Sequence, residues 1–265
     1  MEWPEPPKKL YKYFSYSDKS LATVEKCQIY YASPRSFNDP FDCRTRLDLS
    51  GSEEQQLASV DEALLRNGVI DPDVRHQRAQ AFLTKATRDP ATWERIACGM
   101  RETILNSSAV CCLSENCCNT LMFAHYGQGH QGFCLEFDAV GDSIFAKAKR
   151  VRYEQSYPSV RYVAAPDERT EGFIEALLTK SPEWSYEKEW RLVRLISNVR
   201  DANGQSPVGV YPFSPEHLTG VIFGALMQAD TRDEIIKRVR AGGSQPRLLQ
   251  ARPGSSTYTF DIDPL

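Results

Sequence analysis

The segment from Trp184 to Arg191 holds the densest set of residues able to do chemistry, and it reads Trp-Ser-Tyr-Glu-Lys-Glu-Trp-Arg. If this segment is a strand, Glu187, Glu189 and Arg191 share one face, because alternate side chains of a strand point to the same side. Two carboxylates in one space can stabilise a cationic, oxocarbenium-like transition state and move a proton. Arg191 could neutralise the pair or bind a phosphate. A short Glu-x-Glu also occurs on solvated, salt-bridged strand faces, so a purely structural role stays open.

Two other short strings combine polar and aromatic residues. Asn38 and Asp39 stand in Ser-Phe-Asn-Asp-Pro-Phe-Asp, which is typical of a turn because Asn and Asp before proline favour turns. His125 and Tyr126 end a short apolar segment that reads as a helix, where a histidine more often caps or packs than catalyses. Both strings are therefore site candidates with a structural alternative. The tyrosines at positions 11, 13, 30 and 31 fit cross-strand packing.

Metal-ligating residue types gather in one part of the chain: Cys111, Cys112, Cys117, Cys118, His125 and His130. Structural zinc sites usually take paired ligands about two to four residues apart. On a strand, the adjacent Cys111 and Cys112 would instead point to opposite faces. The eight cysteines belong to a chain without an apolar signal segment at its start. We therefore expect free, reduced thiols and no metal.

A glycine-rich string, Gly-Gln-Gly-His-Gln-Gly at 127–132, fits the letters of the dinucleotide-binding fingerprint. That fingerprint requires a strand before it and a helix after it, which lets the helix N-terminus face the phosphates. Here the pattern predicts a helix before and a strand after, which is the reverse order. The string therefore indicates a tight turn rather than a Rossmann site.

The composition is that of an ordinary globular protein, with 41% hydrophobic and 25% charged residues. A net charge of −3 argues against a chain that grips nucleic acid along its whole surface. No apolar run approaches the ~20 residues that cross a bilayer, so we expect no membrane association and a cytoplasmic location. Two basic clusters could form local patches or merely solvated faces: Lys147, Lys149, Arg150 and Arg152, and Arg232, Lys237, Arg238 and Arg240.

These candidates must be positioned by a mixture of strands and helices that lacks a regular βαβ rhythm. We predict an α+β fold, with a mixed, mostly antiparallel sheet and flanking helices. Residues 1–265 are treated as one domain with a mobile leader over 1–9 and a helical insertion over 52–108. In that insertion apolar residues recur at helical spacing. Pro72 and Pro90 stand where new helices would begin, and Gly68 where one would end.

Strands are predicted where β-branched and aromatic residues lie between turn signals. The predicted strands cover 10–14, 28–32, 110–114, 132–137, 150–153, 187–195, 209–213, 218–223, 247–251 and 258–262. Outside the insertion, helices are predicted over 18–26, 121–126, 169–179 and 231–240. The string from Asp201 to Gly204 predicts a hairpin-like turn.

Several motifs occur together in a fixed order. They are Leu-Tyr-Lys-Tyr at 10–13, Tyr-Ala-Ser-Pro-x-x-Phe-Asn-Asp-Pro-Phe-Asp at 31–42, Cys-Leu-Ser-Glu at 112–115, Leu-Met-Phe-Ala-His-Tyr-Gly-x-x-His-x-Gly-Phe-Cys-Leu-Glu-Phe at 121–137 and Trp-x-Tyr-Glu-x-Glu-Trp-Arg at 184–191. This set resembles a bacterial family catalogued as a domain of unknown function, DUF2971. The resemblance extends from Leu10 to about Gly224 without the helical insertion. It implies no activity.

The order of these motifs also resembles that of ADP-ribosyltransferases. Those enzymes combine an early strand with a basic residue, a strand ending in an aromatic or Ser-containing motif, and a late strand with Glu-x-Glu. The resemblance implies three pairs of site residues: Lys12 with Tyr13, Tyr31 with Ser33, and Glu187 with Glu189. It implies further that Glu189 is the catalytic carboxylate and that Glu187 serves the acceptor.

We therefore expect an ADP-ribosyltransferase-like enzyme that cleaves the nicotinamide–ribose bond of NAD without a metal. The acceptor would be an unknown protein or nucleic acid. The remaining candidate binding residues are Asn38, Asp39, His125, Tyr126 and Arg191. The family resemblance implies a toxin or phage-defence effector, which an inhibitory partner protein could restrain. The alternative is a non-catalytic or nuclease-type defence protein that binds nucleic acid or a partner protein.

Overall fold

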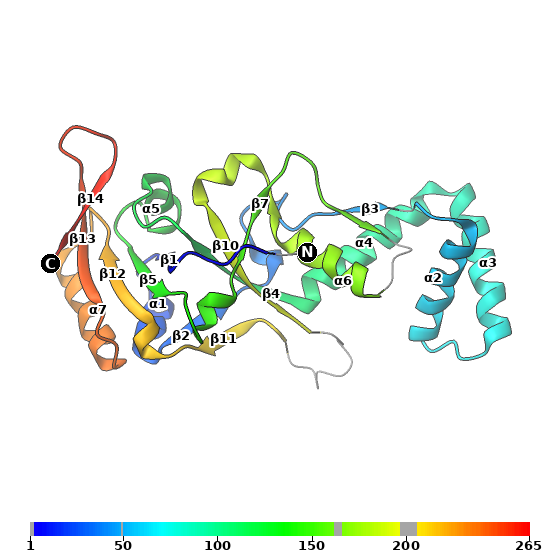
Figure 1. Cartoon of the computed structure of the whole chain (residues 1–265), viewed down its shortest axis with the longest axis horizontal. Coiled ribbons are helices and arrows are strands. Elements are labelled where there is room, and N and C mark those ends of the chain that lie inside the picture. Colours follow the sequence, from blue (N-terminus) through cyan, green and yellow to red (C-terminus); the bar gives the residue numbers. More distant parts are fainter. Residues whose placement is uncertain (1–2, 49, 162–165, 197–205) are drawn as a thin grey trace. The chain divides into compact units, whose positions relative to one another are not determined.

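The computed structural model describes residues 3–48, 50–161, 166–196 and 206–265. The chain forms two compact units (Figure 1). The first comprises Met1–Ser36, Ser107–Tyr153 and Lys180–Leu265, and the second comprises Phe37–Asn106 and Glu154–Thr179. The single domain stays a prediction, as does the mobile leader. Within that leader, the ring of Trp3 lies 5.6 Å from the guanidinium carbon of Arg152.

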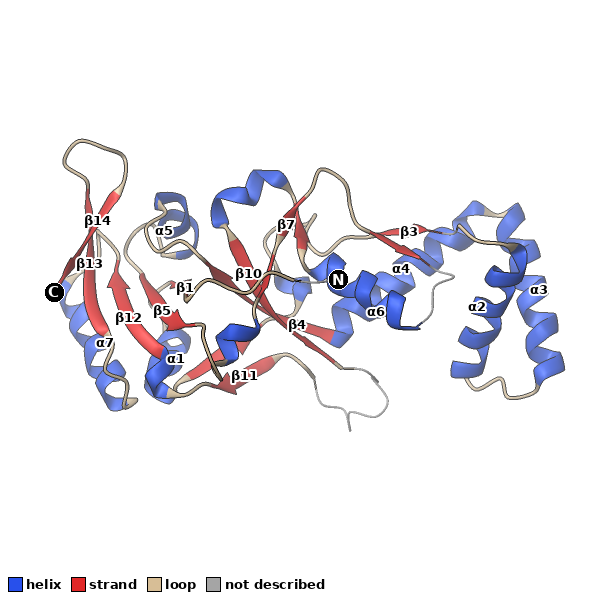
Figure 2. Cartoon of the chain, in the orientation of Figure 1, coloured by secondary structure: helices blue, strands red, loops and turns tan. Residues whose placement is uncertain are grey.

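An eight-stranded sheet forms the centre of the first unit (Figure 2). Its strands are β1 (Lys9–Phe14), β4 (Ser108–Ser114), β5 (Phe133–Asp138), β6 (Lys149–Arg150), β10 (Glu189–Leu195), β12 (Leu218–Phe223), β13 (Arg247–Pro253) and β14 (Phe260–Pro264). They lie in the order β14-β13-β12-β5-β1-β4-β10-β6. Strands β12 and β13 run parallel, and the other neighbours run antiparallel. The predicted α+β fold with a mostly antiparallel sheet is therefore confirmed.

One face of this sheet is apolar and packs against α1 (Asp18–Lys26) and α7 (Ala229–Ala241). Helix α1 begins where the sequence predicts, because Ser17 and Ser20 form a reciprocal capping box. The buried residues that the helices contribute are Leu21, Val24, Ile235 and Val239. This face is closed by packing, which leaves the opposite face for polar chemistry.

The opposite face carries both apolar and ionisable side chains. Directly opposed residues of an antiparallel pair point to the same face. Ser114 opposes both Tyr11 and Glu189, so these three side chains share this face. Here α5 (Thr120–Tyr126) packs through Met122 and Phe123. The face is therefore partly covered by a short helix that ends beside the charged residues.

Shorter elements complete the first unit. Strand β2 (Gln28–Tyr31) pairs with β11 (Gly209–Pro212). Strand β7 (Arg152–Tyr153) pairs with β9 (Thr179–Lys180), of which Lys180 belongs to this unit. Short 3-10 helices are η1 (Pro34–Ser36), η2 (Ile144–Lys147), η3 (Pro182–Glu187) and η4 (Pro215–His217).

The second unit is mainly helical, as predicted for the insertion. Its helices are α2 (Glu53–Arg66), α3 (Pro72–Arg88), α4 (Pro90–Ser107) and α6 (Pro166–Leu177), and β3 (Arg46–Asp48) pairs in parallel with β8 (Ser159–Arg161). Pro72 and Pro90 are the first residues of α3 and α4, as predicted. Gly68 follows the C-cap of α2 and has a φ of 88°. Val60, Ala79 and Leu83 form the local core.

Some predicted elements have different bounds. Strand β10 begins at Glu189 rather than at 187, and β14 begins at Phe260 rather than at 258. The predicted strand over 150–153 is divided at Val151 into β6 and β7. Strands β3, β8 and β9 were not predicted, because two or three residues leave no readable alternation. The predicted turn from Asp201 to Gly204 lies outside the described residues.

The glycine-rich string connects α5 to β5, which is the helix-to-strand order that the sequence predicts. Only glycine fits at position 132, because a Cβ there would collide with the carbonyl oxygen of Phe14. In the part of the chain that the structure describes, no helix combines the length and apolar character needed to cross a membrane.

Candidate functional site

Glu187 and Glu189 lie on either side of a sharp change in backbone direction. Glu187 is the last residue of η3, Lys188 adopts a left-handed conformation with φ 44° and ψ 55°, and β10 begins at Glu189. The prediction that Glu187 shares a strand face with Glu189 and Arg191 is therefore wrong for Glu187. A turn, rather than strand alternation, brings this carboxylate to the site.

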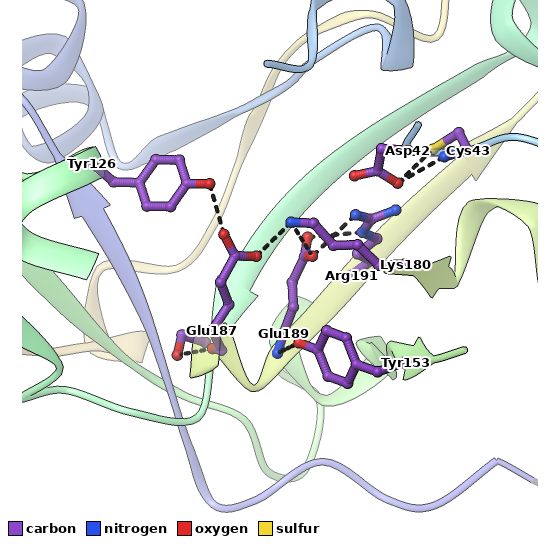
Figure 3. Close-up of polar contacts among 9 residues, drawn as sticks. Asp42, Cys43, Tyr126, Tyr153, Lys180, Glu187, Glu189 and Arg191 are labelled. Atoms are coloured by element: carbon purple, nitrogen blue, oxygen red, sulfur yellow. Dashed lines mark hydrogen bonds and ion pairs between the residues drawn. The ribbon is translucent and has the colours of Figure 1, made fainter. Parts of the chain in front are cut away.

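Lys180 joins the two carboxylates (Figure 3). Its Nζ lies 2.5 Å from Glu187 Oε2 and 3.2 Å from Glu189 Oε2. Arg191 donates from Nε to Glu189 Oε1 at 2.7 Å and from Nη2 to Glu189 Oε2 at 3.0 Å. These four residues form a series of alternating charges, Glu187–Lys180–Glu189–Arg191, which we call the lysine-bridged cluster.

The lysine-bridged cluster is almost completely buried. The exposed fraction of the side chain is 5% for Lys180, 4% for each glutamate and 0% for Arg191. Buried charges interact strongly because little water screens them, and they persist only when they are paired. With all four groups ionised the cluster is neutral, so each charge depends on its neighbours.

The two carboxylates differ in acidity. Burial raises the pKa of Glu187, and the negative charge of Glu189 adds to this, so the contact with Lys180 does not return it to its usual range. Burial also disfavours the Glu189 charge, but Arg191 and Lys180 outweigh this and lower its pKa to about 2. Burial disfavours the Lys180 charge as well, yet the two carboxylates raise its pKa above the usual range. Glu189 is thus held as an anion, whereas burial favours the protonated form of Glu187 more than that of an exposed glutamate.

Hydroxyl groups support both glutamates (Figure 3). The Tyr126 hydroxyl donates to Glu187 Oε1 at 2.7 Å. Ser114 Oγ donates to the Glu187 carbonyl oxygen at 2.6 Å, and the Glu189 backbone N–H donates to the Tyr153 hydroxyl at 2.8 Å. Three elements, α5, β4 and β7, therefore hold the turn that carries the carboxylates.

Aromatic rings border the cluster. Lys180 Nζ lies 4.8 Å from the centre of the Trp184 ring, whose centre is 6.1 Å from that of Tyr186. His125 is exposed and lies 6.3 Å from Tyr186 between ring centres. Trp184 and Tyr186 are half-buried, so they are surfaces that a planar ligand ring could meet.

Lys12 and Tyr13, on β1, use their polar atoms inside the first unit. Lys12 Nζ donates to the Cys112 carbonyl oxygen at 2.9 Å. The Tyr13 hydroxyl donates to the Asn116 carbonyl oxygen at 2.7 Å, and its ring packs edge-on against Phe123. Both residues therefore hold β4 and the loop that follows it.

Tyr31 and Ser33 have structural surroundings. Tyr31 is buried in the apolar core, where its ring meets Tyr211 edge-on at 5.1 Å and the Arg194 guanidinium carbon lies 5.7 Å from its centre. Ser33 Oγ accepts from the Arg35 backbone N–H at 3.3 Å, which shapes a turn. These contacts hold the Tyr31 ring by packing, and its predicted role in binding the substrate stays a prediction.

Asn38 and Asp39 belong to the second unit. Asn38 is exposed, and Asp39 Oδ1 accepts from the Phe41 backbone N–H at 2.8 Å, which is the turn contact predicted for this string. Of the predicted site residues, the structure brings Glu187, Glu189 and Arg191 together with Tyr126, and it places His125 near Tyr186 at their border.

No group of three or more His, Cys, Asp or Glu side chains among the described residues is arranged to hold a metal ion. All eight cysteines are free thiols. Burial raises the pKa of Cys111, Cys112 and Cys134, which keeps these thiols protonated.

The second predicted basic cluster contains an arginine that is paired within the fold. Arg238 of α7 binds both carboxylate oxygens of Glu25 and also pairs with Glu234. In the first cluster, Lys147 and Arg150 are exposed. Part of the positive charge of the cluster on α7 is therefore neutralised by glutamates of the same fold.

The fold and site define an α+β protein with a buried pair of carboxylates bridged by lysine. A family model described as a protein of unknown function, DUF2971, matches residues 122–192. This match confirms the predicted family resemblance over that stretch, which contains the whole lysine-bridged cluster. The resemblance outside 122–192 stays a prediction. No curated protein and no solved structure matches the chain.

Sequence reasoning missed Lys180 and Tyr153. Lys180 follows an apolar run, Ala-Leu-Leu at 176–178, and stands just before Ser-Pro at 181–182. A lysine two positions after an apolar run, at the start of a turn, was the available signal, because a lysine buried there needs an anionic partner. Nothing in the spacing pointed to the partner being Glu187.

Proposed function

We propose that the lysine-bridged cluster is the catalytic centre of an ADP-ribosyltransferase-like enzyme that consumes NAD and modifies a macromolecular acceptor. The observation that carries this proposal is geometric: a single nitrogen, Lys180 Nζ, lies 2.5 Å from the Glu187 carboxylate and 3.2 Å from that of Glu189. The different surroundings of the two carboxylates raise the pKa of Glu187 and lower that of Glu189. Neighbouring carboxylates whose environments separate their pKa values are typical of acid–base pairs in active sites.

The proposed reaction assigns one step to each carboxylate. The C1′–N bond of NAD breaks, the pyridine ring takes both electrons and leaves as neutral nicotinamide, and the ribosyl group becomes cationic. Glu189, which stays ionised, supplies the fixed negative charge beside that cation. The acceptor's lone pair then forms the new bond to C1′, and its proton goes to Glu187, whose basicity burial has increased. The leaving group is already cationic, so the step needs no metal.

Lys180 and Tyr126 act as positioning residues in this proposal. Lys180 fixes the distance between the two carboxylates, and Tyr126 occupies one oxygen of Glu187. Trp184 lies beside Lys180 and next to Tyr186, and the flat surfaces of these two rings suit a substrate with a planar nicotinamide ring.

The first test is nicotinamide release from NAD by the purified full chain, with cell lysate supplying acceptors. Transfer of the ADP-ribosyl group to those acceptors, followed in the same reaction, should fall at least about 100-fold in Glu187→Gln, because the acceptor then lacks its general base. The matched control is Glu136→Gln, which changes another buried glutamate of the same sheet and should retain release within a few-fold. Glu189→Gln is less informative, because it leaves the buried Arg191 and Lys180 short of an anion.

A second test asks whether the protein acts as a toxin or phage-defence effector. Expression of the active chain should inhibit growth, and Glu187→Gln should relieve this inhibition. A restraining partner protein would relieve it in the wild type. The contrary result is that the chain releases no nicotinamide from NAD, with or without lysate, while the wild type and Glu187→Gln inhibit growth equally. In that case the protein acts instead by binding a nucleic acid or a partner.

A further inference from the structure

Arg247 of β13 is an exposed arginine that a buried carboxylate holds in place. Its Nη2 donates to Glu136 Oε1 at 2.9 Å and to Glu136 Oε2 at 3.1 Å, and 65% of the arginine side chain is exposed against 5% of the glutamate side chain. The arginine crosses β12 at Gly220, which is paired with both residues and places no side chain between them. Glu136 is fixed in turn, because the hydroxyls of Thr219 and Tyr11 donate to its two oxygens.

This anchoring contact leaves a pair of N–H donors of Arg247 unused. Both acceptor oxygens belong to one carboxylate, so one N–H of Nη2 points between them. In the part of the chain that the structure describes, Nε and Nη1 of this arginine make no hydrogen bond. Whichever N–H of Nη2 is taken, one edge of the planar guanidinium keeps two parallel N–H groups. Such a pair matches two oxygens of a phosphate or a carboxylate.

Lys9 brings a second cation to the same carboxylate. Its Nζ lies 3.7 Å from Glu136 Oε1, the oxygen that also accepts from Arg247. Lys9 donates to Thr219 Oγ1 at 2.9 Å, whereas Asp138 Oδ1 is 3.8 Å away, beyond hydrogen-bond distance. The lysine side chain is 36% exposed and keeps N–H groups for a ligand. Two cationic nitrogens around one buried oxygen are close enough for a single tetrahedral anion to reach both.

Two other arginines of the first unit show what is particular to Arg247. Arg238 uses both Nε and Nη1 on glutamates, so its donors are largely occupied. Arg252 is also 65% exposed, but its partner Asp263 is 53% exposed, and water competes for that contact. Arg247 combines a buried anchor with an exposed pair of donors, which holds these donors in one orientation.

We propose that Arg247 and Lys9 form a binding site for a phosphate group, with two phosphate oxygens on the arginine and a third on the lysine. A phosphate suits the site better than a carboxylate, because a carboxylate has no oxygen left for Lys9 once both face Arg247. Glu136 does not contact the ligand and acts by positioning the arginine. Donors that are already ordered lose less conformational freedom when the ligand binds.

The phosphate site is separate from the lysine-bridged cluster. Cross-strand pairing runs from Glu189 to Ser114, from Ser114 to Tyr11 and from Tyr11 to Glu136. Three strand spacings, or about 14 Å, therefore lie between the two glutamates along the sheet. The site does not depend on the reaction proposed above, and its test measures binding alone.

Isothermal titration calorimetry of the full chain with inorganic phosphate, in a low-salt buffer at pH 7, tests the site. We expect saturable binding of one phosphate, weakened at least about tenfold in Arg247→Met, because two charged hydrogen bonds are lost. The matched control is Arg252→Met, which removes an equally exposed arginine of the same strand and should change the affinity less than about twofold. Asp138→Asn removes the carboxylate beside Lys9 and should tighten binding about twofold.

Absence of saturable binding to the wild type would overturn the proposal. Equal losses in Arg247→Met and Arg252→Met would also overturn it, because any surface cation would then serve. Arg247→Lys keeps the charge without the paired donors, so an unchanged affinity in that variant would contradict the two-point contact.

Adenosine monophosphate and adenosine distinguish the sources of the phosphate. Tighter binding of the nucleotide than of inorganic phosphate, with no binding of adenosine, would support an organic phosphate as the ligand. Equal binding of the nucleotide and inorganic phosphate would support the free anion. Adenosine binding as tightly as its monophosphate would overturn the proposal, because the phosphate would then contribute nothing.

Discussion

The lysine-bridged cluster and a second charged group on the same sheet face hold their buried glutamates by different means. In the second group Glu136 of β5 is the buried carboxylate, and it accepts from Arg247 Nη2 at 2.9 and 3.1 Å. Thr219 Oγ1 donates to it at 2.7 Å and the Tyr11 hydroxyl at 3.2 Å. Gly220 makes room for it, since a Cβ there would lie 3.1 Å from the Glu136 Cβ. We call this group the arginine-capped cluster.

The difference lies in the cations. In the arginine-capped cluster 65% of the Arg247 side chain is exposed, so water solvates the cation while it reaches the carboxylate. In the lysine-bridged cluster Lys180 and Arg191 are as buried as the glutamates. The pKa of Glu136 is lowered, because Thr219 and Arg247 outweigh the effect of burial, and that of Glu189 is lowered for the analogous reason. A lowered pKa therefore arises both from the water-screened contact of Glu136 with Arg247 and from the unscreened contacts of Glu189.

Removing one charged partner should destabilise the fold more in the lysine-bridged cluster than in the arginine-capped cluster. A buried pair is strongly destabilised when one partner is removed, because the other charge stays desolvated and uncompensated. An exposed cation leaves behind a carboxylate that water or another donor can reach. The lysine-bridged cluster is also the one with a carboxylate of raised pKa, Glu187, and it has no equivalent in the arginine-capped cluster.

The largest predicted effect comes from removing one cation from each cluster. Lys180→Met should lower the free energy of unfolding at pH 7 by about 3–5 kcal/mol, because two buried carboxylates then face each other. Arg247→Met should lower it by no more than about 1 kcal/mol, because the exposed arginine was largely solvated. Urea unfolding of both variants measures the difference, and equal losses would contradict the contrast between buried and exposed cations.

The next effect is a dependence on pH. Glu189 has a folded pKa of about 2, below the ~4.3 of an unfolded glutamate, so the folded state binds its proton less readily. The stability that its charge provides is therefore present above about pH 4.3 and is lost as the pH falls towards 2. The loss should approach about 3 kcal/mol over this window. Urea unfolding between pH 2 and 5 should show this slope in the wild type and a shallower one in Glu189→Gln.

Glu187 supplies the control of opposite sign. Its folded pKa is raised, so its contribution is present below about pH 4.3 and is lost as the pH rises through the folded pKa. Glu187→Gln should therefore gain stability relative to the wild type as the pH rises above 4.3. A parallel pH profile for the two chains would show that Glu187 titrates at its usual pKa.

A smaller effect comes from the hydroxyl donors. Tyr126→Phe removes the 2.7 Å bond to Glu187 and should cost about 1–2 kcal/mol, since the acceptor is a buried carboxylate. Tyr11→Phe removes the longer 3.2 Å bond to Glu136, which keeps Thr219 and Arg247, and should cost about 0.5–1 kcal/mol. Thermal unfolding of the two variants checks the order, and a larger loss for Tyr11→Phe would reverse it.

The sequence predicted the strands and helices well where the signals were local. Alternation identified β10 from Glu189 onward, and the helix predicted over 18–26 has the bounds of α1. Prolines marked α3 and α4 in the same way. Each of these depends on neighbours within a few residues, which is the range that a sequence pattern reports.

The candidate site was predictable only in part, because Lys180 lies seven and nine residues from its two partners, and no strand alternation links these positions. Glu189 and Arg191 share a face by strand alternation, but Lys180 reaches them from a two-residue strand. Glu187 was expected on that strand, and its place instead depends on the left-handed Lys188. Without a glycine or asparagine at 188, no turn signal marked the change of direction.

The smallest predicted effect is a difference in how strongly the two clusters respond to salt. Raising the ionic strength from 0.1 to 1 M shortens the screening length from about 10 to about 3 Å, and this weakens interactions that solvent can reach. The cost of Arg247→Met should therefore fall by about half or more in 1 M sodium chloride, because its guanidinium is 65% exposed. The cost of Lys180→Met should change by less than about a tenth, because ions do not enter the buried cluster. Urea unfolding of both variants at the two salt concentrations measures this. A strongly salt-dependent Lys180→Met would mean that solvent reaches Glu187 and Glu189 in the folded protein, and the two clusters would then differ only in degree.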